Sequence, residues 1–240
     1  MKAPAIIAHR GAAMVAPEST RAAIREAARA GADMVELDVQ MTRDGRLVIF
    51  HDERLERTTN GRGVLTQARY ADVARLDAGG WFHPRFAGER VLLVSQALRL
   101  LPLRMGVNLE LKRTASPRPL IRRLLRLLKH LPRRRALLLS SFDSQLLRLA
   151  KRSGRPLALI CRRRPEESLR RAVRLGCAAW HPFRSLVIPR RVAAAHRAGL
   201  RIQAWTVDDG RAARRLARMG VDGLFTNDPA RLVRALRRRG

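Results

Sequence analysis

Residues 202–229 read IQAWTVDDGRAARRLARMGVDGLFTNDP and combine two kinds of periodicity. The apolar runs at 202–207 and 223–226 are typical of buried strands, and the amphipathic run at 209–219 between them is typical of a helix. A second amphipathic run follows at 229–238. A strand, a crossover helix and another strand in this order predict two parallel strands of one sheet.

The same alternation of strand and helix continues along the whole chain. Further strands are expected at 5–8, 34–39, 47–50, 106–111, 136–141, 156–160 and 178–180. Further helices are expected at 19–30, 94–101, 119–130, 143–152, 165–175 and 189–198. In a chain of 240 residues, this alternation predicts an α/β fold, a TIM-like (β/α)8 barrel that occupies 1–240 as a single domain. Nine candidate strands compete for eight places, and 178–180 is the shortest of them.

Residues 52–90 interrupt the alternation. They contain several glycines and scattered charges, with at most one short helix around 67–76. A long irregular stretch inside a compact domain is usually a functional loop or a small insertion, so we expect a small inserted segment over the barrel. Its main apolar side chains are Trp81, Phe82 and Phe86.

Composition limits the class of protein. The chain is 46% hydrophobic, which excludes a disordered protein, and no stretch approaches 18 consecutive apolar residues. Its two cysteines, Cys161 and Cys177, cannot form a disulfide framework. We therefore expect a soluble, cytoplasmic protein without a transmembrane segment.

The net charge of +30 is the unusual feature of the composition, and residues 121–240 carry 31 basic and 7 acidic residues. One interpretation is a nucleic-acid or acidic-surface partner. The other is a replacement of surface lysines by arginines, since 46 of the 50 basic residues are arginine. The arginines are spread over helical faces and are not interleaved with aromatic residues as in a base-stacking surface, which favours the second interpretation. Either way, the field should attract anionic ligands.

Three carboxylates lie on predicted strands. Glu36 and Asp38 alternate with apolar residues, so their side chains point to the same side of one strand. Two adjacent acids in an apolar strand resist burial, and a hard cation such as Ca²⁺ or Mg²⁺ resolves the repulsion. Glu110 is placed to supply a third ligand. The alternative is that each acid pairs with one of the many arginines.

Two histidines follow apolar runs in a similar way. His9 and His51 each terminate a predicted strand, and polar residues at strand ends form the usual site of such a barrel. Facing each other across a site, they would act as general base and general acid, and the sequence does not specify which is which. Arg10 and Lys112 would supply positive charge for a phosphate.

These residues fall within a set of short motifs that extends over nearly the whole chain. The motifs are His9-Arg-Gly11, Pro17-Glu-Ser-Thr20, Gly31-Ala-Asp-Met-Val-Glu-Leu-Asp-Val39, Thr42-Arg-Asp-Gly45, His51-Asp52, Arg57-Thr-Thr-Asn-Gly61, Asn108-Leu-Glu-Leu-Lys112, Ser141-Phe142, Ala204-Trp-Thr-Val-Asp208 and Gly220-Val-Asp-Gly-Leu-Phe-Thr-Asn-Asp-Pro229. In this order they resemble the glycerophosphodiester phosphodiesterases. The family usually reads Pro-Glu-Asn-Thr where this chain has Pro17-Glu-Ser-Thr20.

The resemblance implies an enzyme that hydrolyses glycerophosphodiesters, such as glycerophosphocholine, to glycerol 3-phosphate and an alcohol. It implies a Ca²⁺ or Mg²⁺ ion held by the three carboxylates, the two histidines as acid and base, and Arg10 and Lys112 as phosphate contacts. It also implies an apolar wall near the glycerol, formed by Phe142 and Trp205.

Two other functions remain open at this point. A related barrel phosphodiesterase would act on lysophospholipid or phosphoinositide head groups, which an apolar rim in 52–90 would favour. A nucleic-acid-binding protein on an inactive barrel would account for the basic second half. The filled catalytic positions favour a small-molecule diester over a specific nucleic acid, and the sequence does not indicate the oligomeric state.

Overall fold

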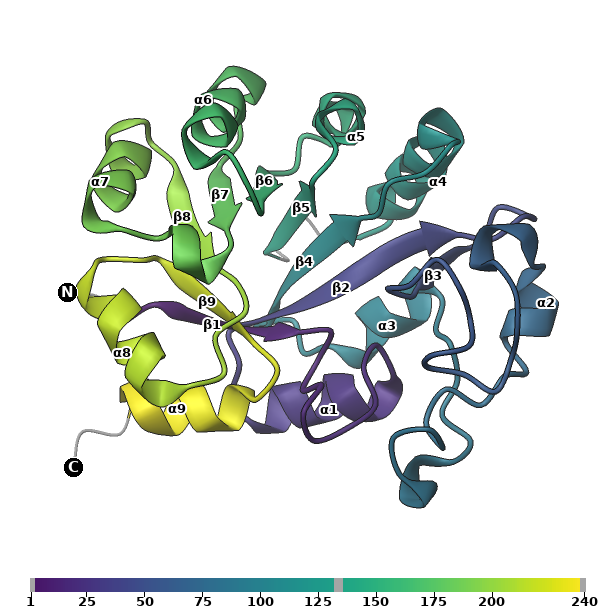
Figure 1. Cartoon of the computed structure of the whole chain (residues 1–240). Helices are drawn as coiled ribbons and strands as arrows, with labels where there is room; N and C mark the ends of the chain where they lie inside the picture. Colours follow the sequence, from purple (N-terminus) through teal and green to yellow (C-terminus); the bar gives the residue numbers. More distant parts are fainter. Residues whose placement is uncertain (1–2, 132–135, 238–240) are drawn as a thin grey trace.

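The computed structural model describes residues 3–131 and 136–237. In these ranges eight parallel strands close into a barrel, with helices around the outside (Figure 1). The strand order is β1-β9-β8-β7-β6-β5-β4-β2, and pairing of β1 with β2 closes the ring. The fold is therefore the TIM-like barrel that the sequence predicts. The barrel strands are β1 (Ala5–His9), β2 (Met34–Met41), β4 (Gly106–Leu111), β5 (Leu137–Ser141), β6 (Leu157–Cys161), β7 (Ala179–Pro182), β8 (Arg201–Ala204) and β9 (Gly223–Thr226).

The outer helices follow the predicted ranges to within two or three residues. They are α1 (Arg21–Arg29), α3 (Val94–Leu100), α4 (Pro117–Lys129), α5 (Ser144–Ala150), α6 (Pro165–Leu175), α7 (Pro189–Arg197), α8 (Gly210–Arg218) and α9 (Pro229–Arg237). Helix α4 shows why they form: Leu120, Leu124 and Leu128 recur every four residues and are buried, while the arginines between them face outward. The main hydrophobic core lies between these helices and the strands.

The surplus strand is β3 (Leu47–Ile49), and not the short run at 178–180. Strand β3 pairs antiparallel with β2 outside the ring, whereas the run at 178–180 corresponds to β7, whose Trp180 is fully buried. The turn at Thr42-Arg-Asp-Gly45 reverses the chain, with Gly45 in the left-handed region at φ +79°.

This hairpin determines how His51 reaches the barrel. Strand β2 continues to Met41, and β3 returns beside it until the backbone N–H of Phe50 donates to the Asp38 carbonyl at 3.0 Å. His51 is thus returned to the level of Asp38 by a hairpin. The expectation that it ends a strand equivalent to β1 was wrong in its geometry, because β3 runs against the barrel strands.

Residues 52–90 contain only short elements: η1 (Leu65–Gln67), α2 (Tyr70–Val73) and η2 (Pro84–Phe86). The segment lies at one side of the barrel (Figure 1) and shares a small apolar cluster with β3. The members of this cluster are Val48, Phe50, Leu55, Leu65, Val73, Ala78 and Val91. Trp81, Phe82 and Phe86 stack edge-to-face on one another at centroid distances of 5.6 and 5.7 Å.

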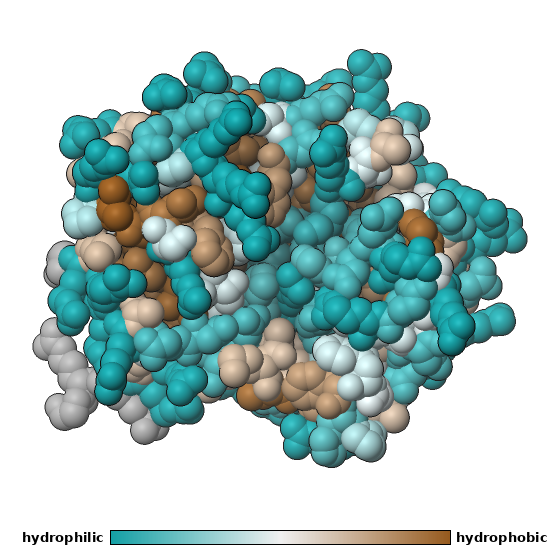
Figure 2. Space-filling view, viewed as in Figure 1, coloured by the Kyte–Doolittle hydropathy of each residue, from teal (hydrophilic) through white to brown (hydrophobic). Residues whose placement is uncertain are grey.

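The surface agrees with the basic, polar composition. The face shown in Figure 2 is mostly hydrophilic, and its hydrophobic residues gather in small groups. None of the helices within 3–131 and 136–237 has the length and apolar character needed to cross a membrane.

Candidate active site

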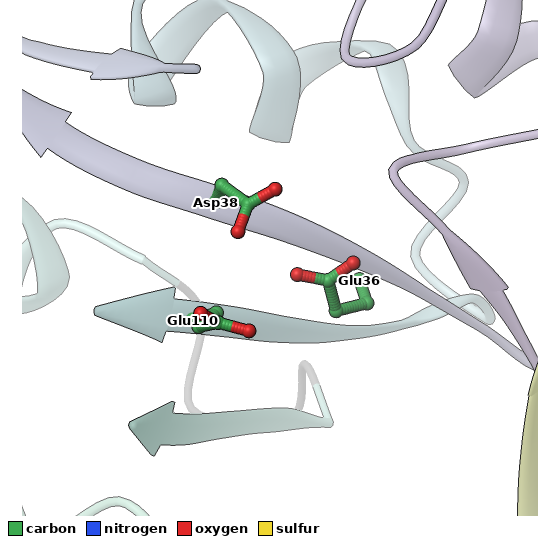
Figure 3. A group of neighbouring side chains, drawn as sticks. All are labelled: Glu36, Asp38 and Glu110. Atoms are coloured by element: carbon green, nitrogen blue, oxygen red, sulfur yellow. The ribbon is translucent and has the colours of Figure 1, made fainter. Parts of the chain in front are cut away.

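Three carboxylates from two neighbouring strands lie together in the barrel. Glu36 and Asp38 come from β2 and Glu110 from β4, where Asp38 and Glu110 are paired in register. One oxygen from each lies within 4.8 Å of the others, and the three side chains turn toward one another (Figure 3). The alternation of side chains along β2 therefore places both of its acids on the inner side of the barrel, as the sequence predicts.

The electrostatics of this cluster are those of acids without sufficient counter-charge. Burial, followed by the negative charge of Asp38, raises the pKa of Glu36 well above its usual range. The same two causes raise the pKa of Glu110 to about 7. Among the described residues, Glu36 Oε1 and Asp38 Oδ2 are buried and accept no hydrogen bond. Clustered carboxylate oxygens with unused lone pairs are the donor set that Ca²⁺ and Mg²⁺ prefer, so the residues fit such an ion.

The alternative, simple ion pairing, accounts for part of the cluster. Lys112 Nζ donates to Glu110 Oε1 at 2.8 Å and lies 3.3 Å from Asp38 Oδ1. Arg10 Nε lies 3.3 Å from Asp38 Oδ2. Within the described part of the chain, the side chain nearest to Glu36 in an ion-pair geometry is that of His9, whose Nε2 is 4.0 Å from Glu36 Oε2. Two cations near three acids leave the cluster short of positive charge.

His9 is held in one tautomer by a chain of hydrogen bonds. Asp208 Oδ2 accepts from Asn227 Nδ2 at 2.8 Å, which turns Asn227 Oδ1 toward His9 Nδ1, also at 2.8 Å. Because an amide oxygen can only accept, His9 Nδ1 carries the proton and Nε2 presents its lone pair to the site. Burial, followed by the nearby charge of Arg10, lowers the pKa of His9 to about 4. The ring is therefore neutral at pH 7.

His51 has a different partner. Its Nδ1 lies 2.5 Å from Asp52 Oδ1. Burial lowers the pKa of His51, while the charge of Asp38 and the hydrogen bond with Asp52 oppose that effect. Asp52 itself is held ionised, since hydrogen bonding from Arg57 lowers its pKa to about 2. A carboxylate at Nδ1 stabilises an imidazolium, so His51 is better suited than His9 to carry a proton.

The loop after β1 presents Arg10 to the cluster. Arg10 adopts φ +55°, which lets its backbone N–H donate to Glu36 Oε2 at 3.0 Å. The next residue, Gly11, has φ +84°, and a Cβ there would lie 2.7 Å from the Ala23 backbone. Only glycine fits between this loop and α1. Ser19 closes the loop with an N–H bond to the Arg10 carbonyl at 2.8 Å.

Ser19→Asn is expected to raise Tm by about 1–4 °C. Ser19 sits in the left-handed region at φ +63°, where asparagine is several-fold enriched, an effect of roughly 0.5–1 kcal/mol. Its buried Oγ has no hydrogen-bond partner within the described ranges, so the substitution breaks no bond. Helix α1 is capped by Thr20, whose Oγ1 accepts from Ala23 N–H. Thermal unfolding followed by circular dichroism checks this, and an unchanged or lower Tm would contradict it. The control Ser95→Asn, inside α3, should lower Tm slightly.

Phe142 and Trp205 are brought together at the ends of β5 and β8, with ring centroids 5.7 Å apart. Phe183, to which the sequence motifs assign no role, has its ring centroid 5.2 Å from that of Trp205. The indole N–H of Trp205 donates to the His181 carbonyl at 2.8 Å, which fixes the ring. Phe142 is 47% exposed, so this aromatic wall has a free face.

A groove of about 840 Å³ begins at His51 and Lys112. Ten of its twelve lining residues are polar or charged, although about half of the surface they expose to the groove is apolar, and the lining contains neither Trp81 nor the two phenylalanines stacked with it. The lining residues are Gln40, Met41, Thr42, Arg43, His51, Glu53, Thr66, Lys112, Arg113, Thr114, Ala115 and Ser116. The charged residues of this lining, Arg43, Lys112 and Arg113 among them, suit a ligand that carries an anionic group.

The sequence motifs contain the residues that hold the histidines and Arg10, but sequence reasoning assigned them no role; these residues are Asn227, Asp208, Asp52, Glu18 and Arg57. Asn227 could have been found, because it directly follows β9 at the same edge of the barrel as His9. Glu18 and Arg57 are 39 residues apart and meet only through the fold.

Comparisons with known proteins agree with this arrangement. The profile of the Glycerophosphoryl diester phosphodiesterase family matches residues 9–231. A glycerophosphodiester phosphodiesterase of Caldanaerobacter subterraneus subsp. tengcongensis is 36% identical and covers 98% of each chain. One from Bacillus altitudinis is 31% identical and covers 95% of this chain and 96% of its own.

Solved structures show the same likeness. The structure of an Oleispira antarctica phosphodiesterase in complex with the product sn-glycerol-3-phosphate superimposes on this chain with a TM-score of 0.93. It is 33% identical over 97% of this chain and 96% of its own. That of a glycerophosphodiester phosphodiesterase from Agrobacterium tumefaciens has a TM-score of 0.83 and is 30% identical over 95% of this chain and 98% of its own.

Proposed function

The chain belongs to the glycerophosphoryl diester phosphodiesterase family, and we propose that it hydrolyses glycerophosphodiesters to glycerol 3-phosphate and an alcohol by a divalent-cation-dependent, two-histidine mechanism. The observation that carries the proposal is the buried cluster of Glu36, Asp38 and Glu110 with unused oxygens, set beside His9 and Arg10. Ca²⁺ or Mg²⁺, held by these carboxylates, would supply positive charge to a phosphate oxygen as negative charge builds up on it.

The two histidines take different roles in this proposal. His9, neutral and with a free lone pair at Nε2, removes the proton of the attacking hydroxyl group. His51, whose Nδ1 lies against the ionised Asp52, donates a proton to the leaving alcohol oxygen. The P–O bond to the alcohol breaks as the new P–O bond forms, and one proton is taken while one is given. With water as the nucleophile this step releases glycerol 3-phosphate. With the glycerol hydroxyl of the substrate as the nucleophile it gives a cyclic phosphate, which water then opens with the two histidine roles exchanged. Arg10 and Lys112 bind the phosphate oxygens from the two sides of the cluster.

The test is the release of glycerol 3-phosphate from glycerophosphocholine. We expect turnover to cease in excess chelator and to return when Mg²⁺ or Ca²⁺ is added. Full activity in chelator would contradict the cation requirement, and no product with either cation would contradict the proposed reaction.

Two further substrates address the alternatives. A lysophospholipid with the same head group should show a lower kcat/KM, because the groove at His51 and Lys112 is lined by charged side chains and by none of the aromatic residues of the 52–90 segment. Salt-dependent retention on DNA by a protein without diesterase activity would instead favour the nucleic-acid interpretation. The preferred head group and a cytoplasmic location stay predictions.

A further inference from the structure

Arg57, in the irregular 52–90 segment, hydrogen-bonds two carboxylates at once. Its Nε and Nη2 donate to Asp52 Oδ2 and Oδ1 at 2.5 and 3.0 Å. Its Nη1 and Nη2 donate to Glu18 Oε2 and Oε1 at 2.9 and 2.7 Å. The guanidinium therefore makes two bidentate contacts, one to the loop after β1 and one to the chain directly after His51.

Each of these carboxylates also holds a group of the proposed catalytic machinery. Asp52 Oδ1, the oxygen that accepts from Arg57 Nη2, lies 2.5 Å from His51 Nδ1. Glu18 Oε1 accepts from Arg57 Nη2 and also from Arg10 Nη1 at 3.0 Å. The Arg57 guanidinium is thus linked to the His51 imidazole through one carboxylate and to Arg10 through the other.

The arrangement of Glu18 and Asp52 requires an arginine between them. Glu18 and Asp52 are both negative and share one partner, so without Arg57 they would repel each other and turn their oxygens to solvent. Their side chains are 12% and 25% exposed, so this partner is not readily replaced by water. Only a planar fork of N–H groups satisfies two carboxylates in fixed orientations, whereas a lysine ammonium acts as a point charge.

We propose that Arg57 is a positioning residue that orients His51 through Asp52 and Arg10 through Glu18. Through these contacts it connects the 52–90 segment to the candidate catalytic residues of the barrel, and it does not itself contact the reacting atoms. The inference rests on the proposed roles of His51 and Arg10.

The experiment compares Arg57→Lys with Arg54→Lys in the full-length enzyme with saturating Mg²⁺. Arg54 is in the same segment, and its exposed side chain pairs with Glu56 at 2.7 Å. We expect Arg57→Lys to lower kcat about 10- to 100-fold, because misplacement of a catalytic group by about 1 Å costs on that order. Mg²⁺ affinity should change much less than kcat, since Arg57 contacts none of Glu36, Asp38 and Glu110 directly. Arg54→Lys should stay within twofold of the parent.

Chemical rescue separates positioning from a structural role. Millimolar methylguanidinium should restore part of the kcat of Arg57→Ala without changing its Tm, while methylammonium at the same ionic strength should not. A kcat for Arg57→Lys within twofold of the parent would overturn the inference, and so would a rescue that only follows recovery of Tm.

His51→Ala, measured in parallel, distinguishes the two proposals. An inactive His51→Ala beside a fully active Arg57→Lys refutes the inference and leaves the proposed function in place. An active His51→Ala refutes the proposed mechanism itself, and the inference with it.

Discussion

His9→Ala and His51→Ala are each expected to lower kcat by roughly 10²- to 10⁴-fold on glycerophosphocholine, the range for loss of a positioned proton-transfer group. Both rings are at least partly buried at the carboxyl end of the barrel and neither supports the main core, so both variants should keep the parent's circular dichroism spectrum. Steady-state release of glycerol 3-phosphate measures the loss. Near-parental turnover in either folded variant would remove that histidine from the mechanism.

The leaving group decides which histidine is the acid. A glycerophosphodiester of p-nitrophenol needs no proton on its departing oxygen, so His51→Ala should recover much of its rate on that substrate. His9→Ala should stay slow, because the attacking hydroxyl still has to lose its proton. The opposite pattern would exchange the two roles. His196→Ala is the matched control, since His196 lies on α7 and pairs with Asp222 at 2.9 Å, and it should behave like the parent.

The barrel could be predicted because it depends on local periodicity. Alternation of apolar strands with amphipathic helices appears in the order of residues, and the inward side of β2 follows from the spacing of Glu36 and Asp38. The role of β3 could not be predicted this way. A three-residue apolar run reads the same whether it continues the ring or returns along β2, and only the short turn at 42–45 distinguishes the two.

The chemical groups of the site could be predicted better than the contacts that orient them. His9, His51 and the carboxylates can be recognised in the sequence as polar residues within or next to apolar strands. Asn227 is 218 residues from His9, and Arg57 binds carboxylates of two different loops. Neither contact therefore produces a local pattern in the sequence. Such long-range polar contacts depend on loop geometry, which hydrophobic periodicity does not specify.

Glu36→Gln, Asp38→Asn and Glu110→Gln are each expected to weaken Mg²⁺ or Ca²⁺ binding by at least about 10²-fold, since even a residue behind the ligands commonly contributes 10- to 100-fold. Isothermal titration calorimetry measures the affinity, and turnover should fall in parallel. Glu26→Gln serves as the control, because Glu26 is on the exposed side of α1 and contacts only Arg29 among the described side chains. Parental affinity in all three variants would place the cation elsewhere.

Glu36→Gln, which weakens cation binding, should by contrast stabilise the metal-free protein above neutral pH. Burial and mutual repulsion raise the pKa of Glu36 and bring that of Glu110 to about 7, so the folded state retains protons that the unfolded chain releases near pH 4.5. Stability of the metal-free parent should therefore fall as the pH rises from about 4.5 through 7. Glu36→Gln removes one buried charge and should flatten this decline, giving a higher Tm at pH 8 in chelator and a smaller rise of Tm on adding Mg²⁺. A fall of Tm in chelator would contradict this. It would mean that the contacts of Glu36 stabilise the fold more than the repulsion among the three acids destabilises it.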